Sequence, residues 1–505
     1  MQHRLPPRRP EGGVYRGIPS AFLPPNLVKK DAGIYNLVVI GAGTAGLVTA
    51  AGSVALGARV ALIERNQMGG DCLNFGCVPS KALISSSRLL HRMRNAKRWG
   101  IEEIEPVFDF SAVFAQMRKA RAELAPLDSE ERFESLGVDV FRGEATFLSP
   151  QELVVGDQKL RARSFIIATG SRAAIPEVIG ASHLPYFTNE TIFDELKEKP
   201  ESLLIIGGGP IGCELGQMFG RLGVKVTIVQ NGARLLNNED PAVSEFVQAN
   251  LEAEGVRILA GFKLAEAKES AQGITLRGAD QSISGRALLI AAGRQPNVEN
   301  LNLSKANVSF TEHGVTVNDY LETSQPGIYA IGDLVGQLQF THVADYHARI
   351  IIRNTLVPFS FLRQKVDYSV VPWCTFLDPE VATVGLTESR ANERGIEYDL
   401  IEQEMKAVDR AVVERAEAGF ARVLVKHGSD EILGATIVGE HAGELIQEFV
   451  LAMKHGIGLK QIASTIYAYP TFASLVLKSA EKFNKKRLTP RARAITGWLY
   501  RRSRK

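Results

Sequence analysis

Cysteine is scarce in this chain, which has only 4 among its 505 residues. So few cysteines cannot form the disulfide framework of a small secreted scaffold, and they favour a reducing compartment. We therefore expect a cytoplasmic protein. No uninterrupted apolar run approaches about 18 residues, and the first residues, MQHRLPPRRPEGG, lack the apolar core of a signal peptide. No second Cys/His pair has zinc-ligand spacing, so we expect no metal centre.

Net charge is also small, at +3, and the composition is that of a globular protein of two to four domains. The charge is uneven, because residues 481–505 hold ten Lys and Arg against one acid, and Trp498, Leu499 and Tyr500 lie among them. This basic tail is either a solvated end or a segment that contacts an anionic membrane or an acidic partner. We expect no nucleic-acid partner.

A strand, a glycine-rich turn, a helix and a second strand follow one another from residue 37. The turn has the spacing G-x-G-x-x-G, which lets the backbone approach a pyrophosphate while the helix start offers free N–H groups to phosphates. Glu64 ends the second strand, where it can accept hydrogen bonds from ribose hydroxyls. We therefore predict a site for FAD or NAD at Gly41, Gly43, Gly46 and Glu64.

The same pattern recurs from residue 203, with one difference. Gln230 stands where the first fold has Glu64, so this second site does not repel a ribose 2′-phosphate, and Arg234 is the nearest cation for one. This favours NADPH, although glutamine can also hold the plain ribose of NADH. The predicted second site comprises Gly207, Gly209, Gly212, Gln230 and Arg234. Two dinucleotides in one chain indicate a flavin and a nicotinamide cofactor, with hydride passing between them.

Between the two folds, Cys72 and Cys77 lie five residues apart in the stretch GGDCLNFGCVPSK, which ends at Lys81. Two such cysteines followed by a helix can form a strained disulfide, and the helix start and Lys81 would lower the pKa of a thiolate. The alternative is a pair of buried structural cysteines. Beside two nucleotide-binding folds, we favour a redox-active pair.

With this stretch, the motifs IIATG at 166–170, AGRQPN at 292–297 and IYAIGD at 328–333 resemble those of the flavoprotein disulfide reductases, the pyridine nucleotide-disulfide oxidoreductases. The resemblance covers about residues 35–487. It implies an α/β chain of two doubly wound, Rossmann-like dinucleotide-binding domains and an α+β C-terminal dimerisation domain. We expect a leader at 1–35, an FAD domain at 36–185 and 315–365, an NAD(P)H domain at 186–314, a dimerisation domain at 366–487 and the basic tail at 488–505.

The resemblance also implies roles for residues of this chain. Cys72 is the thiol that attacks the substrate and Cys77 is the thiol beside the flavin. Glu214 pairs with Lys81 near flavin N5, Asp333 holds the ribityl chain, and Thr341 and His342 start a helix aimed at the flavin pyrimidine. The remaining cofactor residues that it implies are Gly70, Asp71, Thr169, Gly170, Gly293, Arg294 and Gly332.

Near the C-terminus the chain departs from the disulfide-reducing members, which carry His-Pro-Thr-x-x-Glu as a proton shuttle. Here Tyr469 and Ser474 replace the histidine and the glutamate. An ordinary tyrosine pKa of about 10 is poorly matched to proton transfer near pH 7. Mercuric reductases also have a tyrosine here, and DPEVATVG at 378–385 and AGELIQ at 442–447 are similar to their sequences. However, mercuric reductases carry a C-terminal Cys-Cys and arginines for the 2′-phosphate, where this chain has no cysteine and Asn231 and Asn237.

These observations predict a homodimeric FAD enzyme that passes electrons from NADPH or NADH to a Cys72–Cys77 disulfide and on to an acceptor. The most similar members are mercuric reductases, so mercuric or another metal ion is the expected acceptor, with Tyr469 beside it. One alternative is a disulfide reductase of the dihydrolipoamide dehydrogenase or glutathione reductase type, whose substrate supplies its own proton. Another is a flavoprotein interaction module recruited to a membrane or complex by the basic tail.

Overall fold

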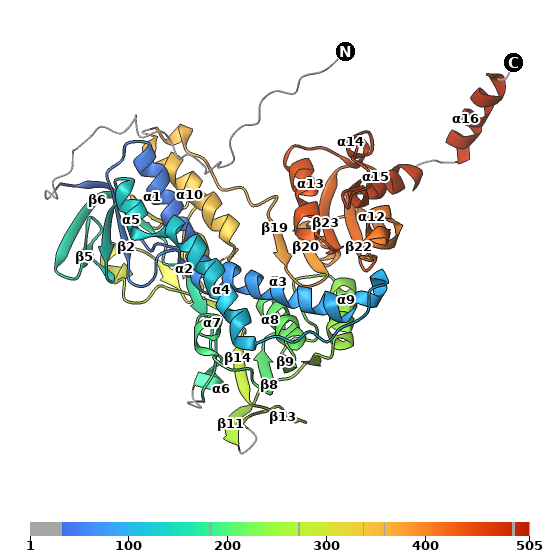
Figure 1. Cartoon of the computed structure of the whole chain (residues 1–505). Coiled ribbons are helices and arrows are strands. Elements are labelled where there is room, and N and C mark those ends of the chain that lie inside the picture. The colour runs from blue at the N-terminus through green and yellow to red at the C-terminus, as the bar shows by residue number, and fades with distance from the viewer. Residues whose placement is uncertain are drawn as a thin grey trace, which may run out of the picture. The chain divides into compact units, whose positions relative to one another are not determined.

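The computed structural model describes residues 33–180, 184–270, 273–336, 338–357, 359–486 and 490–503. Residues from Tyr35 onward form one compact unit, and the predicted leader falls almost entirely outside the described residues. Along the described part of the chain, every helix is too short or too polar to cross a bilayer. Three sheets dominate this unit (Figure 1).

The first sheet has seven strands and carries the first glycine turn. Strand β1 reads YNLVVI and is buried at all but one position, so it lies at the centre, with parallel neighbours β2 and β6. Its strands are β1 Tyr35–Ile40, β2 Val60–Glu64, β3 Asp139–Arg142, β4 Ala145–Ser149, β5 Glu152–Val155, β6 Gln158–Ile167 and β18 Ile328–Ala330. Helices α1, Thr44–Ala55, and α10, Thr341–Leu356, pack against each other beside this sheet.

The second sheet is a four-stranded parallel sheet in the order β10-β9-β8-β14, and it carries the second glycine turn. Helix α8, Pro210–Arg221, follows the turn directly, and α9, Pro241–Ala253, links β9 to β10. The strands are β8 Ser202–Ile206, β9 Lys225–Gln230, β10 Arg257–Ala260 and β14 Ala287–Ile290. An antiparallel extension consists of β11 Glu266–Ser270, β12 Gly273–Arg277 and β13 Ser282–Gly285.

The third sheet is antiparallel, in the order β19-β20-β23-β22-β21. Helix α13, Ala442–Lys454, packs on β20 and β23, and α15, Ser474–Lys486, packs on β21, burying an apolar cluster that includes Phe449, Leu475 and Val476. The strands are β19 Pro372–Thr375, β20 Glu380–Gly385, β21 Tyr398–Glu404, β22 Phe420–Lys426 and β23 Ile432–Gly439. Together the three sheets confirm the predicted fold class, with two dinucleotide-binding sheets and a C-terminal α+β part.

Helix α3, Cys77–Arg94, connects these parts, because it packs on both α4, Phe110–Leu124, and α8. Its buried Leu83 and Ile84 belong to one apolar cluster with residues of α8 and of β20. Asp240 adds a polar link, since its carboxylate accepts hydrogen bonds from the N–H groups of Glu388 and Ser389, at 2.9 Å each, at the start of α11, Glu388–Glu393.

The remaining elements are short connectors. The helices are α2 Gly70–Asn74, α5 Glu130–Ser135, α6 Glu177–Gly180, α7 Ile192–Glu195, α12 Asp409–Val413 and α14 Leu459–Ala463. The small strand pairs are β7 Ser171–Ala173 with β15 Arg294–Pro296, and β16 Phe310–Thr311 with β17 Gly314–Val315. Part of the basic tail forms α16, Pro490–Arg502, on which Ile495, Trp498, Leu499 and Tyr500 are exposed. The predicted contact of this tail with a membrane or a partner stays a prediction.

The last glycine of each G-x-G-x-x-G turn is required by packing. A Cβ at Gly46 would lie 1.8 Å from the carbonyl oxygen of Gly41, and one at Gly212 would lie 1.9 Å from that of Gly207. Both oxygens are main-chain atoms, which cannot swing aside as a side chain can. A Cβ at Gly209, by contrast, would meet nothing within 4 Å.

We therefore expect Gly212→Ala to lower the free energy of unfolding of the part of the chain built on the second sheet by about 3 kcal/mol, the upper end of the typical cost of overpacking a core. Gly209→Ala, the matched control, should lower it by no more than about 1 kcal/mol, because the new Cβ meets no neighbouring atom and alanine only weakens the N-cap of α8. Thermal unfolding of both variants compares them. Equal melting temperatures would contradict the packing argument.

Candidate active site

A single cavity of about 1820 Å³ extends from the first glycine turn past the cysteine pair to the second glycine turn. Most of the predicted site residues line it, although they come from segments far apart in the sequence. They are Gly41, Gly43, Glu64, Gly70, Asp71, Cys72, Cys77, Lys81, Thr169, Gly170, Gly207, Gly209, Glu214, Gln230, Gly293, Arg294, Gly332, Asp333, Thr341 and His342. Four predicted residues do not line this cavity, namely Gly46, Gly212, Arg234 and Tyr469.

The first glycine turn is shaped to receive a dinucleotide. The Glu64 carboxylate accepts hydrogen bonds from the N–H groups of Ala42 and Asn66, at 2.7 Å each, which fixes the acid at the turn. A Cβ at Gly70 would lie 2.5 Å from the Cα of Gly43, so a side chain there would fill the space between the two backbones. Bare backbone N–H groups at a helix start fit a pyrophosphate, and the residues present therefore fit FAD.

The two cysteines are free thiols on consecutive helices, since Cys72 lies in α2 and Cys77 is the first residue of α3. A hydrogen bond from Cys72 lowers the pKa of the Cys77 thiol, and Thr341, whose Oγ1 lies 3.6 Å from the Cys77 sulfur, and the Lys81 ammonium lower it further. The same hydrogen bond, together with burial, raises the pKa of Cys72. The opposed directions of the two pKa shifts favour the thiolate on Cys77 and the protonated thiol on Cys72.

Lys81 lies one helical turn after Cys77 and forms an ion pair across to α8. Its Nζ is 2.8 Å from Oε2 of Glu214, whose side chain is only 6% exposed. The other oxygen, Oε1, accepts a hydrogen bond from the backbone N–H of Phe376 at 2.7 Å. The Lys81 ammonium also lies 4.5 Å from the centre of the Phe376 ring. The structure therefore brings the predicted Lys81–Glu214 pair together in the cavity wall.

A second group of charges surrounds Asp333. Arg294 lies between two carboxylates, 3.3 Å from Asp71 and 3.6 Å from Asp333, and Ser171 donates a hydrogen bond to Asp333 at 2.7 Å. Burial raises the pKa of Asp333, while Arg294 and Ser171 oppose that rise. The arrangement fixes the Asp333 carboxylate at the cavity wall, where it can accept a hydrogen bond from a sugar-like hydroxyl.

Thr341 and His342 open α10 beside this group. The Nε2 atom of His342 lies 2.8 Å from the carbonyl oxygen of Pro372, so it carries the proton and donates the hydrogen bond. Burial lowers the pKa of His342, which keeps the ring neutral. The Nε2–H group of His342 is therefore used in a hydrogen bond to the backbone. His347 on the same helix accepts the N–H of Gly332 at 3.1 Å, which fixes the turn that precedes Asp333.

In the second glycine turn, the residue that ends the following strand supports the turn as it does in the first. Oε1 of Gln230 accepts the N–H of Gly208 at 2.9 Å, as Glu64 accepts that of Ala42, so Gln230 supports the turn. Lys263, absent from the sequence prediction, lines the cavity beside it. Main-chain hydrogen bonds from Gly261 to Gly232 and from Phe262 to Gln230 hold this lysine next to the end of β9.

Tyr469 lies elsewhere in the same subunit. Its side chain is 76% exposed, and its hydroxyl donates a hydrogen bond to Asp409 at 2.9 Å, which raises its pKa. Tyr467 likewise donates to Glu448, at 2.7 Å. Neither lines the cavity of its own chain. The role predicted for Tyr469, which requires the partner subunit's cavity, stays a prediction.

Several cavity residues could not be recognised from the sequence motifs. Asn189 donates hydrogen bonds to Asp71, at 3.1 Å, and to the Phe75 carbonyl, at 3.2 Å, and so supports α2. Trp373 and Phe376 enter the wall from β19 and the residue after it. In the sequence, Trp373 and Phe376 stand just before the segment DPEVATVG. The family resemblance includes that segment but implies no role for either residue.

Two dinucleotide-binding sheets that share one cavity with a thiol pair define a flavoprotein disulfide oxidoreductase. The sequence model described as pyridine nucleotide-disulphide oxidoreductase matches residues 35–348, and that of the family's dimerisation domain matches residues 371–480. The chain belongs to this family. Its members are NAD(P)H-dependent flavoenzymes that use FAD, and both cofactors suit the cavity described above.

Several curated relatives are similar over most of the chain. A mercuric reductase of Lysinibacillus sphaericus is 35% identical over 456 residues, covering 89% of this chain and 83% of the relative. A dihydrolipoyl dehydrogenase of Chlamydia muridarum is 34% identical over 460 residues, covering 88% and 96%. Among solved structures, the Cu(II) complex of the HOCl-induced flavoprotein disulfide reductase RclA from Escherichia coli superposes with a TM-score of 0.80 at 26% identity, covering 89% of this chain and 99% of that one.

The opposed pKa shifts of the two thiols give a pH prediction. In Cys72→Ser the serine hydroxyl can still donate to the Cys77 sulfur, whereas in Cys72→Ala this hydrogen bond is lost. A hydrogen bond to a charged group contributes about 1.5–3 kcal/mol, so the pKa of Cys77 should be higher by about one unit or more in Cys72→Ala. The Cys77 thiolate should therefore be lost at a higher pH, as the medium is acidified, in the alanine variant.

The long-wavelength thiolate–flavin absorption of the holoprotein, followed from alkaline to acid pH, measures this difference. Both variants lack the second sulfur, so neither can form the disulfide and the comparison is matched. Identical midpoints in the two variants would show that Cys72 does not set the charge of Cys77.

Proposed function

We propose that the chain is an NAD(P)H-dependent flavoenzyme that reduces a metal ion, with mercuric ion as the first candidate. The observation that carries this proposal is the thiol pair that lines the cavity. In the sequence, Tyr469 occupies the position at which the disulfide-reducing members carry a proton-shuttling histidine. Sulfur ligands suit soft metal ions. The mercuric reductases among the relatives and the Cu(II) complex of RclA support a metal acceptor.

When the Cys72–Cys77 disulfide is reduced, the directions of the two pKa shifts decide which sulfur takes up the proton. FAD, when bound, relays the two electrons of the NAD(P)H hydride to the sulfurs. The sulfur–sulfur bond between Cys72 and Cys77 breaks, the one proton that accompanies the electron pair ends on Cys72, and Cys77 remains as the thiolate. Lys81 and Glu214 hold a positive charge beside the flavin position, and Thr341 stabilises the thiolate of Cys77.

A mercuric ion then binds both sulfurs, and Cys72 releases its proton to solvent. Two electrons from a further NAD(P)H reduce Hg(II) to elemental mercury, which leaves the sulfurs as they were before the ion bound. This sequence needs no base directed at a thiol, because metal binding itself lowers the pKa of Cys72. Tyr469 of each subunit supplies a polar neighbour to the other subunit's metal in the homodimer that the family's dimerisation domain implies. A cytoplasmic location suits a pair that must be kept reduced.

Steady-state NAD(P)H consumption with purified holoenzyme tests the acceptor. We expect turnover with mercuric ion and at least about 100-fold less with lipoamide or glutathione disulfide, the lower range for loss of an acid–base group. Cys72→Ala and Cys77→Ala should abolish mercuric turnover. Turnover with a disulfide alone would overturn the metal proposal.

The second candidate is a disulfide reductase, which the dihydrolipoyl dehydrogenases among the relatives favour. A substrate with a low-pKa leaving thiol needs little help from a base. In that case Tyr469→Phe would keep its activity on disulfides, whereas on the metal proposal the same substitution lowers mercuric turnover. The two candidates therefore differ in the response of one variant.

For the nicotinamide cofactor, we propose that Lys263 recognises the 2′-phosphate of NADPH. Lys263 lines the cavity next to Gln230, while Arg234 does not line it. A charge-assisted contact contributes about 1.5–3 kcal/mol, so Lys263→Ala should raise the KM for NADPH by roughly 10-fold to 100-fold and leave that for NADH unchanged. Arg234→Ala is the matched control and should leave both constants nearly unchanged. A rise in the KM for NADPH in Arg234→Ala and not in Lys263→Ala would show that Arg234, and not Lys263, binds the 2′-phosphate.

A further inference from the structure

A short segment of the C-terminal part of the chain, residues 376–378, lies along one face of α8. Glu214, Gln217 and Arg221 are spaced i, i+3 and i+7 on that helix, and all three side chains bond this segment. Glu214 accepts the Phe376 N–H at 2.7 Å, Gln217 accepts the Asp378 N–H at 2.8 Å, and Arg221 pairs with the Asp378 carboxylate at 2.8 Å. The helix that carries the Lys81 partner therefore also sets the position of Phe376.

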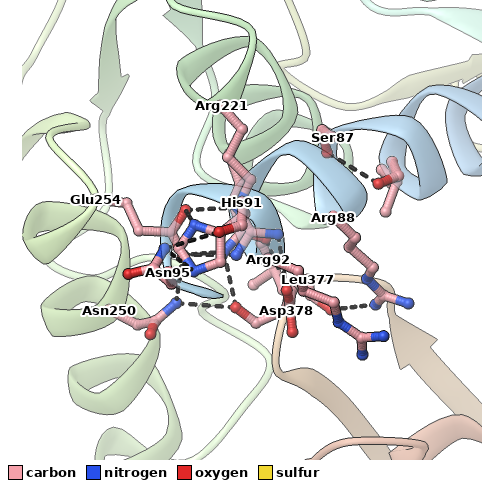
Figure 2. A network of polar contacts seen from close by, with 12 residues as sticks. Ser87, Arg88, His91, Arg92, Asn95, Arg221, Asn250, Glu254, Leu377 and Asp378 are labelled. Carbon is pink, nitrogen blue, oxygen red and sulfur yellow. Dashed lines mark hydrogen bonds and ion pairs between the residues drawn. The ribbon is translucent and has the colours of Figure 1, made fainter. Parts of the chain in front are cut away.

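The far end of this contact is a buried polar network (Figure 2). The Arg221 side chain is 4% exposed and is held by Glu254 as well as by Asp378, at 2.7 and 2.8 Å. Asn250 donates to the Asp378 carbonyl at 3.1 Å, and Arg88 of α3 donates to the Leu377 carbonyl at 2.6 Å. Helices α3, α8 and α9 thus grip the same three residues, so the segment has little freedom to shift.

At the near end, Phe376 contacts both members of the ion pair in the cavity wall. Its N–H holds Oε1 of Glu214, and its ring faces the Lys81 ammonium at 4.5 Å. The Lys81 side chain is 34% exposed, so a long flexible side chain must be held in one rotamer beside open space. The ring restricts that rotamer and attracts the cation through its negative face.

We propose that Phe376 is a positioning residue for the Lys81–Glu214 pair, and that the Arg221–Asp378 anchor fixes it. The inference rests on the proposed role of Lys81 beside the flavin. The C-terminal part of the chain thereby contributes to the flavin site of its own subunit, through one ring and one backbone N–H.

The holoenzyme tests this with Phe376→Leu, which removes the aromatic face, and Phe376→Tyr, which keeps it. Phe376→Met is a second variant without a ring, in case leucine fails to fold. Phe420→Leu is the matched control, because Phe420 packs edge-to-face on Phe246, at 5.8 Å, away from the ion pair. Melting temperature reports packing, and the midpoint potential of the bound flavin reports the charge beside it.

A well-placed ammonium stabilises the reduced, electron-rich cofactor. Its displacement should therefore lower the midpoint potential in Phe376→Leu by about 30 mV, the equivalent of a tenfold change for a two-electron couple. Reduction by NADPH should slow in parallel. Phe376→Tyr should keep the native potential, and Phe420→Leu should change only the melting temperature.

The variant Lys81→Met distinguishes a failure of the role proposed for Lys81 from a failure of the role proposed for Phe376. If Lys81→Met leaves the potential unchanged, the proposed role of Lys81 is wrong, and the role of Phe376 fails with it. If Lys81→Met lowers the potential while Phe376→Leu and Phe376→Met do not, the inference about Phe376 alone is overturned. Equal potentials in the leucine and tyrosine variants would also overturn it.

Discussion

The ion pair between Lys81 and Glu214 joins the two halves of the site. Lys81 lies on the helix that starts at Cys77, and Glu214 lies on the helix that follows the second glycine turn. A buried carboxylate needs a partner, because leaving it unpaired in a poorly solvated wall costs several kcal/mol. The pair therefore requires the thiol-bearing helix and the nicotinamide-binding helix to meet, and the shared cavity follows from that contact.

Local patterns were sufficient to predict both nucleotide folds and the thiol pair. Each G-x-G-x-x-G turn can be recognised from its spacing alone, because its last glycine is needed for the helix to approach the strand. The place of Lys81 near Cys77 follows from their spacing along one helix, and the short separation of Cys72 from Cys77 in sequence is what predicted a redox pair. For the same reason Glu64 and Gln230, at the end of equivalent strands, were found at equivalent places.

What the sequence left open depends on contacts between distant segments. Lys263 reaches the second site only because main-chain hydrogen bonds place the loop after β10 beside the end of β9. Arg234 is closer in sequence, but it does not line the cavity. Phe376 lies far along the chain from Lys81, directly after β19, in a segment whose composition shows nothing about a cation. Tyr469 was found by its motif, yet its target depends on a second subunit, which no local pattern describes.

The polar contacts between α8 and residues 376–378 also limit how the parts of the chain can move relative to one another. Together with Asp240, whose carboxylate binds the start of α11, they tie the part of the chain built on the second sheet to the C-terminal part by several partly buried polar contacts at separate points. A hinge rotation of the whole second-sheet part would break these contacts at once, which makes such a rotation costly. We therefore expect a cofactor to enter and leave through rearrangements of loops and side chains around a rigid frame, on the faster time scale of such local motions.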